Sequence, residues 1–184
     1  MSYSFEFQID TATRSYLWRQ LSSSEAIRFQ TMKSSDHPSQ AWNWLMLQGL
    51  FLNEETPISW DFLDREMLPG EYRAIQEMLA ENIMAISIAD GQLVAKPEYE
   101  GLLSGGIEIS CKTLYAGTFA QIQDAIVSKN SAGLGKVLQS AYGVAVADLN
   151  FWECSALLND LSNQLAGDSQ VPKVTKYTPP TGKK

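Results

Sequence analysis

Residues 2–10 alternate between apolar and polar side chains. The apolar members of this pattern are Tyr3, Phe5, Phe7 and Ile9. Successive side chains of a β-strand point to opposite faces, so the two-residue period predicts a half-buried strand with one aromatic face. Such a strand needs a neighbouring strand to satisfy its backbone hydrogen bonds.

The residues that follow supply a candidate for that neighbour. A polar turn at 10–13 leads into a second aromatic run, Ser15-Tyr16-Leu17-Trp18-Arg19, which predicts an N-terminal β-hairpin. A helix over 13–21 is the alternative interpretation. Ser22 and Glu25 then have the spacing of a capping box, which predicts a helix from 23 to 33.

Most of the remaining chain has the apolar spacing of α-helices. We expect helices at 40–52, 58–67, 70–84, 118–129, 133–142 and 148–165, and a loop at 34–39. The helix at 40–52, which carries Trp42 and Trp44, is apolar almost all round its axis. It therefore lies either centrally in the core or partly covered by a partner.

A second hairpin is predicted at 85–95, where two short apolar runs flank Asp90-Gly91. Asp and Gly accept the positive φ that a tight type I′ turn requires. A short strand is expected at 107–111. The predicted fold class is therefore α+β, mainly α-helical, with an N-terminal β-hairpin and a short central β-hairpin.

Turn residues and composition divide the chain into three predicted parts. Gly105-Gly106 marks the junction between an N-terminal hairpin plus helical domain, 1–104, and a helical C-terminal subdomain, 105–167. Residues 168–184 repeat Pro and Lys and are predicted to be an extended basic tail.

The formal net charge of −7 is distributed unevenly. Residues 38–100 contain eleven acidic and three basic residues, a net of −8, whereas 168–184 contains four lysines and one acidic residue. An acidic surface repels phosphates, so we expect no nucleic-acid partner and expect the protein to bind neutral or basic surfaces.

Residues that commonly perform catalysis or bind metals are scarce. The chain has one histidine, His37, in a polar loop, and two cysteines, Cys111 and Cys154, without a C-x-x-C motif. We expect buried free thiols and no catalytic, metal, cofactor or small-molecule site. No signal peptide or membrane span is predicted. An enzyme using unidentified carboxylates is a third-ranked alternative.

A winged-helix protein is the second interpretation. Three predicted helices across 40–84, followed by the hairpin at 85–95, match the order of its elements. The helix at 70–84 carries three glutamates against Arg73 alone, which is unfavourable next to DNA phosphates. This alternative is therefore a winged-helix-like adaptor or transcriptional regulator that contacts protein.

Aromatic residues are the best candidates for a contact surface, because they dominate the hot spots of protein interfaces. Ordinary core packing is the alternative role for them. The candidate interface residues are Tyr3, Phe5, Phe7, Trp18, Trp42, Trp44, Lys173, Lys176 and Tyr177. We expect strand 2–10 to offer an edge to a partner strand, and the tail to lie along an acidic neighbour such as 38–100 of a second copy.

Two segments resemble small proteins of tailed-phage tail and baseplate assembly, including tail assembly chaperones and baseplate hub subunits. They are the hairpin end Trp18-Arg19-Gln20-Leu21-Ser22-Ser23-Ser24-Glu25 and the Tyr-Gly pattern with its short helix at 141–153. The resemblance implies a non-enzymatic structural or assembly role. The implied partners are copies of the chain or other tail and baseplate components, in the host cytoplasm or in a virion.

Overall fold

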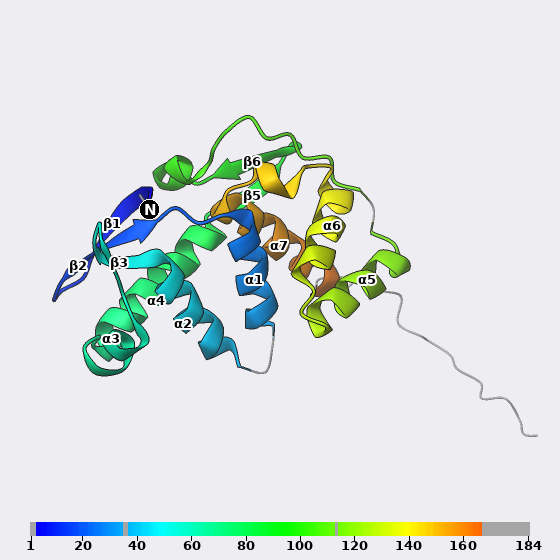
Figure 1. Ribbon diagram of the computed structural model, residues 1–184. Helices are drawn as coiled ribbons and strands as arrows, with labels where there is room; N and C mark the ends of the chain where they lie inside the picture. Colours follow the sequence, from blue (N-terminus) through cyan, green and yellow to red (C-terminus); the bar gives the residue numbers. More distant parts are fainter. Residues whose placement is uncertain (1–2, 35–36, 113, 167–184) are drawn as a thin grey trace, which may run out of the picture.

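The computed structural model describes residues 3–34, 37–112 and 114–166, which form a mainly helical α+β fold (Figure 1). The strands are β1 (Phe5–Asp10), β2 (Ser15–Arg19), β3 (Leu50–Asn53), β4 (Thr56–Pro57), β5 (Ile86–Ala89) and β6 (Gln92–Ala95). The α-helices are α1 (Ser23–Lys33), α2 (Pro38–Gly49), α3 (Trp60–Arg65), α4 (Pro69–Met84), α5 (Ala116–Val127), α6 (Ser131–Tyr142) and α7 (Phe151–Ala166). Short 3₁₀ helices are η1 (Pro97–Leu102) and η2 (Val146–Asp148). The predicted fold class is confirmed.

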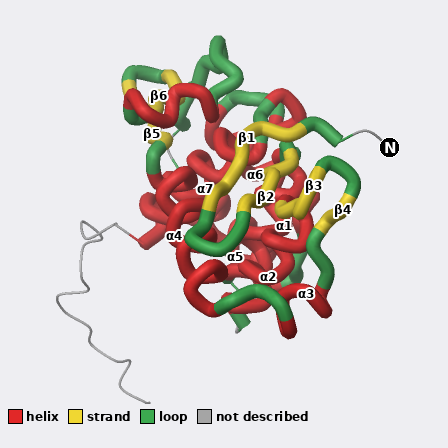
Figure 2. The backbone as a smooth tube through the Cα atoms, turned by 90° about the vertical axis from the view of Figure 1, so that its left-hand side faces the viewer, coloured by secondary structure: helices red, strands yellow, loops and turns green. Residues whose placement is uncertain are grey.

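The strands form two antiparallel units. One is a four-stranded sheet in the order β1-β2-β3-β4, and the other is the β5–β6 hairpin. Figure 2 shows the larger sheet on one side of the molecule with the helices behind it. Helix α1 packs against α2 and α7, while α5 pairs with α6 at the end of the molecule away from the sheet (Figure 1). One buried core runs from Ile9 to Leu161, so the predicted parts 1–104 and 105–167 share it.

Trp18 lies in the middle of the sheet face that packs on the helices. Its ring is fully buried, stacks on Phe7 with 6.2 Å between ring centroids, and lies 6.0 Å from the ring of Trp152 on α7. Gly49, the last residue of α2, backs directly onto this ring, so that a Cβ atom there would overlap the indole. The absence of a side chain at Gly49 therefore lets α2 end against the tryptophan.

The predicted helix 40–52 is wrong at its end, because α2 stops at Gly49 and the chain enters β3. Leu50 pairs with Trp18, and Phe51 pairs with Leu17. The apolar run continues without a break through this point, which is why it favoured a longer helix. Pairing with β2, some thirty residues earlier in the chain, decides the backbone conformation instead.

The predicted strand at 107–111 is also wrong, since only one isolated bridge forms there, between Gln92 and Glu108. The N–H of Ser110, and that of Lys112 just after the segment, donate instead to the carbonyl groups of Tyr142 and Ala141 at the end of α6. The segment thus satisfies the last carbonyls of a helix rather than a strand ladder.

The central hairpin follows its sequence signal closely. Asp90 and Gly91 occupy the turn between β5 and β6 with φ values of 51° and 74°. Helices α2, α3 and α4 precede it, as the winged-helix interpretation expects, but β3 and β4 lie between α2 and α3 and complete the larger sheet.

Glu71 ties the N-terminal hairpin to the start of α4. Its carboxylate accepts hydrogen bonds from Tyr16 Oη at 3.1 Å and Leu68 N–H at 2.9 Å, and pairs with Arg14 at 3.2 Å. Burial alone would raise the pKa of Glu71, but hydrogen bonds from Thr13, Leu68 and Tyr16 and the charge of Arg14 together lower the pKa below its ordinary 4.5. The charged form is therefore the one that the fold stabilises.

We expect Glu71→Gln to lower the free energy of unfolding by about 1–3 kcal/mol at neutral pH, because it removes the charge from a buried hydrogen-bonded pair. The folded pKa lies below the unfolded pKa, so this contribution is present above the unfolded pKa and is lost as pH falls through the folded pKa. Urea unfolding at pH 7 and at about pH 3 should show the gap between wild type and variant shrinking in acid. Glu77→Gln, at an exposed position of the same helix, is the control. An equal gap at both pH values would contradict this role of the charge.

Gly49→Ala is expected to destabilise the protein by about 1–3 kcal/mol, because the added methyl group overlaps the buried Trp18 ring. Gly70→Ala is the matched control: nothing lies within 4 Å of a Cβ atom there, and alanine favours the helix. Thermal unfolding of both variants measures the difference. Similar melting temperatures would mean that the indole ring can move away from α2 at little cost.

Candidate functional site

Strand β1 contains a β-bulge that divides its aromatic side chains between the two sheet faces. Phe5 lies opposite Arg19, yet Phe7 lies opposite Trp18, so β1 uses one more residue than β2 over this stretch. Glu6 accepts a hydrogen bond from the indole N–H of Trp152 on α7 at 2.8 Å, and Phe7 stacks on Trp18. Glu6 and Phe7 therefore both face the helices, and Phe5 lies on the outer face of the sheet.

Phe5 and Tyr3 pack on Phe51 on the outer face of the sheet. The ring centroids of Tyr3 and Phe51 are 4.8 Å apart, and those of Phe5 and Phe51 are 5.3 Å apart. We name these three residues the outer aromatic cluster. Phe51 is buried by its neighbours but lies outside the main core, while Tyr3 is 41% exposed. The predicted single aromatic face is therefore wrong for Tyr3 and Phe5, because the bulge inverts the alternation, and correct for Phe7 and Ile9.

β1 ends the four-stranded sheet, and no other strand of the described chain pairs with its second edge. At the hairpin turn the Thr11 N–H donates to the Arg14 carbonyl at 2.9 Å. Antiparallel strands exchange such bonds at every second residue, so the N–H and C=O of Ile9 point toward β2. The backbone groups of Gln8 and Asp10 point away from β2, along the open edge. The predicted exposed edge is thus present over the second half of β1.

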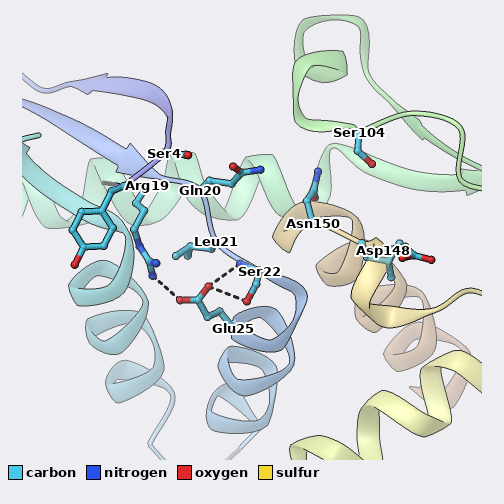
Figure 3. A pocket seen from close by; sticks show the side chains of 11 residues that line it. Ser4, Arg19, Gln20, Leu21, Ser22, Glu25, Ser104, Asp148 and Asn150 are labelled. Carbon is cyan, nitrogen blue, oxygen red and sulfur yellow. Dashed lines mark hydrogen bonds and ion pairs between the residues drawn. The ribbon is translucent and has the colours of Figure 1, made fainter. Parts of the chain in front are cut away.

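An open groove with a volume of about 650 Å³ lies beside the start of β1 (Figure 3). Ser4 and Gln20 lie on one side of it, and Ser104 and Asn150 on the other. The remaining lining residues are Tyr3, Arg19, Leu21, Ser22, Glu25, Asp148 and Leu149. Because Tyr3 and Ser4 immediately precede β1, the groove lies at the beginning of this strand, on the side of the Gln20 N–H, which donates to the Ser4 carbonyl at 2.7 Å.

The groove is polar but nearly neutral at its centre. Arg19 donates to Glu25 at 2.6 Å and to the Gln48 carbonyl at 3.0 Å, and its guanidinium lies 5.7 Å from the centre of the Tyr3 ring. Glu25 also accepts from the Ser22 N–H at 2.7 Å, which confirms the predicted capping of α1. With Arg19 and Glu25 paired to each other, the groove presents hydroxyl, amide and backbone groups that suit a peptide backbone, together with the carboxylate of Asp148.

Residues at the start of α7 form hydrogen bonds that fix the side of the groove opposite β1. Glu153 is buried and accepts hydrogen bonds from the Ser104 N–H at 2.6 Å and the Asn150 N–H at 2.9 Å. The Asn150 side-chain amide donates to the Leu102 carbonyl at 2.8 Å. Asn150 and Glu153 have the three-residue spacing of a capping box, which is the signal that could have found this helix start. The contacts with Ser104 and Leu102 join residues about fifty positions apart, and no sequence pattern indicates them.

The tryptophans proposed for contact do not share one surface. Trp18 and Trp42 are buried, the latter against Phe29 at 5.0 Å between ring centroids, which removes both from the surface open to a partner. Trp44 is half-buried, with the Arg28 guanidinium 5.0 Å from its ring centre. The remaining candidates lie outside the described residues and are Lys173, Lys176 and Tyr177.

The two cysteines differ in environment. Cys154 is buried, as expected, and desolvation raises the pKa of its thiol to about 12. Cys111 is exposed, which corrects the prediction of two buried thiols: its segment follows the end of α6 across the surface. Among the described residues, no group of three or more His, Cys, Asp or Glu side chains is placed to hold a metal ion.

Comparison of the chain with protein-family models, curated proteins and solved structures gave no match. Within the ranges that the structure describes, no helix has the length and apolar character needed to cross a membrane.

The bulge predicts unequal effects for two neighbouring phenylalanines. Phe7→Ala should lower the free energy of unfolding by about 2–4 kcal/mol, because it opens space beside Trp18, whereas Phe5→Ala on the outer face should cost about 1 kcal/mol. Chemical denaturation of both variants measures the difference. Equal losses would indicate that both rings lie in the core, as uninterrupted alternation requires.

Proposed function

We propose that this protein has no enzymatic role and works by binding another protein, whose strand adds to the open edge of β1. The observation that carries the proposal is the outward direction of the Gln8 and Asp10 backbone groups on a strand that ends its sheet. Extended segments bind in this way because the edge supplies ready hydrogen-bond partners. The bulge at the start of β1 limits regular pairing to 7–10, so the added strand is short.

Charge and shape define the strand that fits. Hydrogen bonds from Ser15 and then Gln8 lower the pKa of Asp10, so this carboxyl is ionised at neutral pH. Two β1 strands paired antiparallel about Gln8 would set Asp10 of each copy opposite the bulge at Glu6 of the other, which limits their regular pairing to 7–9. The outer aromatic cluster offers apolar contact next to the edge. A partner strand that alternates basic and apolar side chains therefore fits better than a second copy.

We infer further that the partner belongs to a multi-protein assembly of the phage tail or baseplate type. The support is the resemblance of 18–25 and 141–153 to tail and baseplate assembly proteins. These two segments are neighbours in the fold, since Ser22 and Asn150 form a β-bridge beside the groove. A strand edge next to a groove is a suitable joint between subunits, because neither partner has to unfold to form it.

Gln8→Pro tests the proposal, because proline removes the outward N–H and leaves the inward bonds of β1 intact. Gln8→Thr is the matched control, since threonine suits a strand and keeps the N–H. Each version of the full chain is co-expressed with the proteins encoded beside it, and complexes are isolated by size exclusion. We expect at least one complex with wild type and Gln8→Thr, weakened roughly tenfold or more in Gln8→Pro.

Two outcomes would contradict the proposal. A complex unchanged in Gln8→Pro, with circular dichroism and melting temperature equal to those of Gln8→Thr, would mean that β1 is not the contact. The second outcome concerns the genome: if no genes for tail tube, sheath or tape-measure proteins lie near the gene for this protein, the phage-type assembly loses its support. The binding result alone then decides whether strand addition occurs.

A further inference from the structure

The segment that carries Ser104 also borders a second, smaller pocket, which has a volume of about 150 Å³. Half-buried Leu93, Leu103 and Ile107 give this pocket apolar walls. The other lining residues are Gln92, Gly105, Gly106, Glu108 and Glu153. A cavity of this size holds a small organic group, so the pocket has room for one side chain with an apolar stem.

Glu153 is the buried residue of this pocket. It is only 1% exposed, whereas Glu108 is exposed at the surface. Glu153 therefore lies at the base of the pocket and Glu108 nearer its mouth. No ion pair among the described residues involves either carboxylate. Because buried carboxylates are usually paired with a cation, the described part of the chain leaves the pocket without its counter-charge.

The hydrogen bonds of Glu153 leave one acceptor position unused. Its Oε1 atom accepts from the N–H and the hydroxyl of Ser104, each at 2.6 Å, and its Oε2 atom accepts from the Asn150 N–H at 2.9 Å. A carboxylate offers about four such positions, two on each oxygen. The unused position is therefore on Oε2. It suits a single N–H donor better than the two parallel N–H groups of a guanidinium fork.

Gly105 and Gly106 keep the mouth of the pocket open. Their φ values are 81° and 74°, in the left-handed region that favours glycine. Nothing lies within 4 Å of a Cβ atom built on either residue. The chain thus turns here, from Ser104 bonded to Glu153 toward Ile107, without placing a side chain at the rim.

We propose that this pocket binds a primary alkylammonium group, the end of a lysine side chain from a partner protein. The four-carbon stem of lysine lies along the apolar walls, and its ammonium group donates to Oε2 of Glu153 beside the charge of Glu108. The surrounding segment 90–108 contains four acidic residues and one basic residue, which attracts a basic partner. The pocket is separate from the open β1 edge, and the inference does not rest on strand addition there.

An NMR titration of the full chain with n-butylammonium chloride, which has the stem and charge of a lysine side chain, tests the pocket. We expect the amide resonances of Gly105 and Gly106 and the carboxyl carbon of Glu153 to shift with a dissociation constant on the order of millimolar. The uncharged analogue n-butanol should bind at least about tenfold more weakly. N-acetyl-lysine methylamide, a lysine as it occurs within a polypeptide, should bind as well as n-butylammonium.

Three results of this titration would overturn the proposal. The absence of saturable shifts with n-butylammonium would mean that the pocket is not a site. Tighter binding of n-butylguanidinium would exclude the preference for lysine. Binding of n-butylammonium without binding of the blocked lysine would indicate a free amine as the ligand instead of a partner protein.

Two single substitutions locate the ammonium group. Glu108→Gln removes the exposed carboxylate and leaves the hydrogen bonds of Glu153 intact, and we expect it to weaken n-butylammonium binding about threefold to tenfold at about 0.15 M salt. Glu98→Gln, an exposed position on η1 outside the pocket, is the matched control and should bind like wild type. Equal affinities of the two variants would contradict the placement. Gln8→Pro should leave this binding unchanged, so failure of the pocket and failure of strand addition are told apart.

Discussion

The burial of Trp18 is the interaction on which the rest of the fold depends. The indole ring joins three elements that are distant in sequence: Phe7 of β1 stacks on it, Trp152 of α7 lies against it, and Gly49 ends α2 beside it. A ring of this size removes a large apolar area from water. Trp18 also fixes where β3 begins, because Leu50 pairs with Trp18 as soon as α2 ends.

The bulge in β1 follows from the same arrangement and has the greatest consequence for function. With Glu6 bonded to the Trp152 indole and Phe7 stacked on Trp18, two successive side chains face the helices. The preceding residues are thereby turned outward, and Tyr3 and Phe5 gather around Phe51. One local irregularity therefore creates an apolar outer face at the same strand that leaves its edge unpaired. That coincidence of apolar surface and free backbone groups is the basis for proposing strand addition.

Local patterns allowed both hairpins, most helices and the cap of α1 to be predicted. The Asp90-Gly91 turn and the Glu25 cap depend only on residues a few positions apart. Strand β3 and the bulge could not be predicted, because the apolar run through Leu50 and the alternation through Glu6 continue without a sequence break. Contacts with distant residues decide both. For the same reason the sequence indicated aromatic contact residues but could not separate buried Trp18 and Trp42 from exposed Tyr3.

Residue-resolved amide exchange along β1 of the isolated protein tests most directly whether the edge is open. The account predicts an alternating pattern: the Ile9 amide, bonded to β2, exchanges slowly, and the amides of Gln8 and Asp10 exchange at rates close to those of an unstructured peptide. On binding of a partner, the Gln8 and Asp10 amides should slow while that of Ile9 changes little. Equal protection of all three amides in the isolated protein would show that the edge is already covered and would contradict the account.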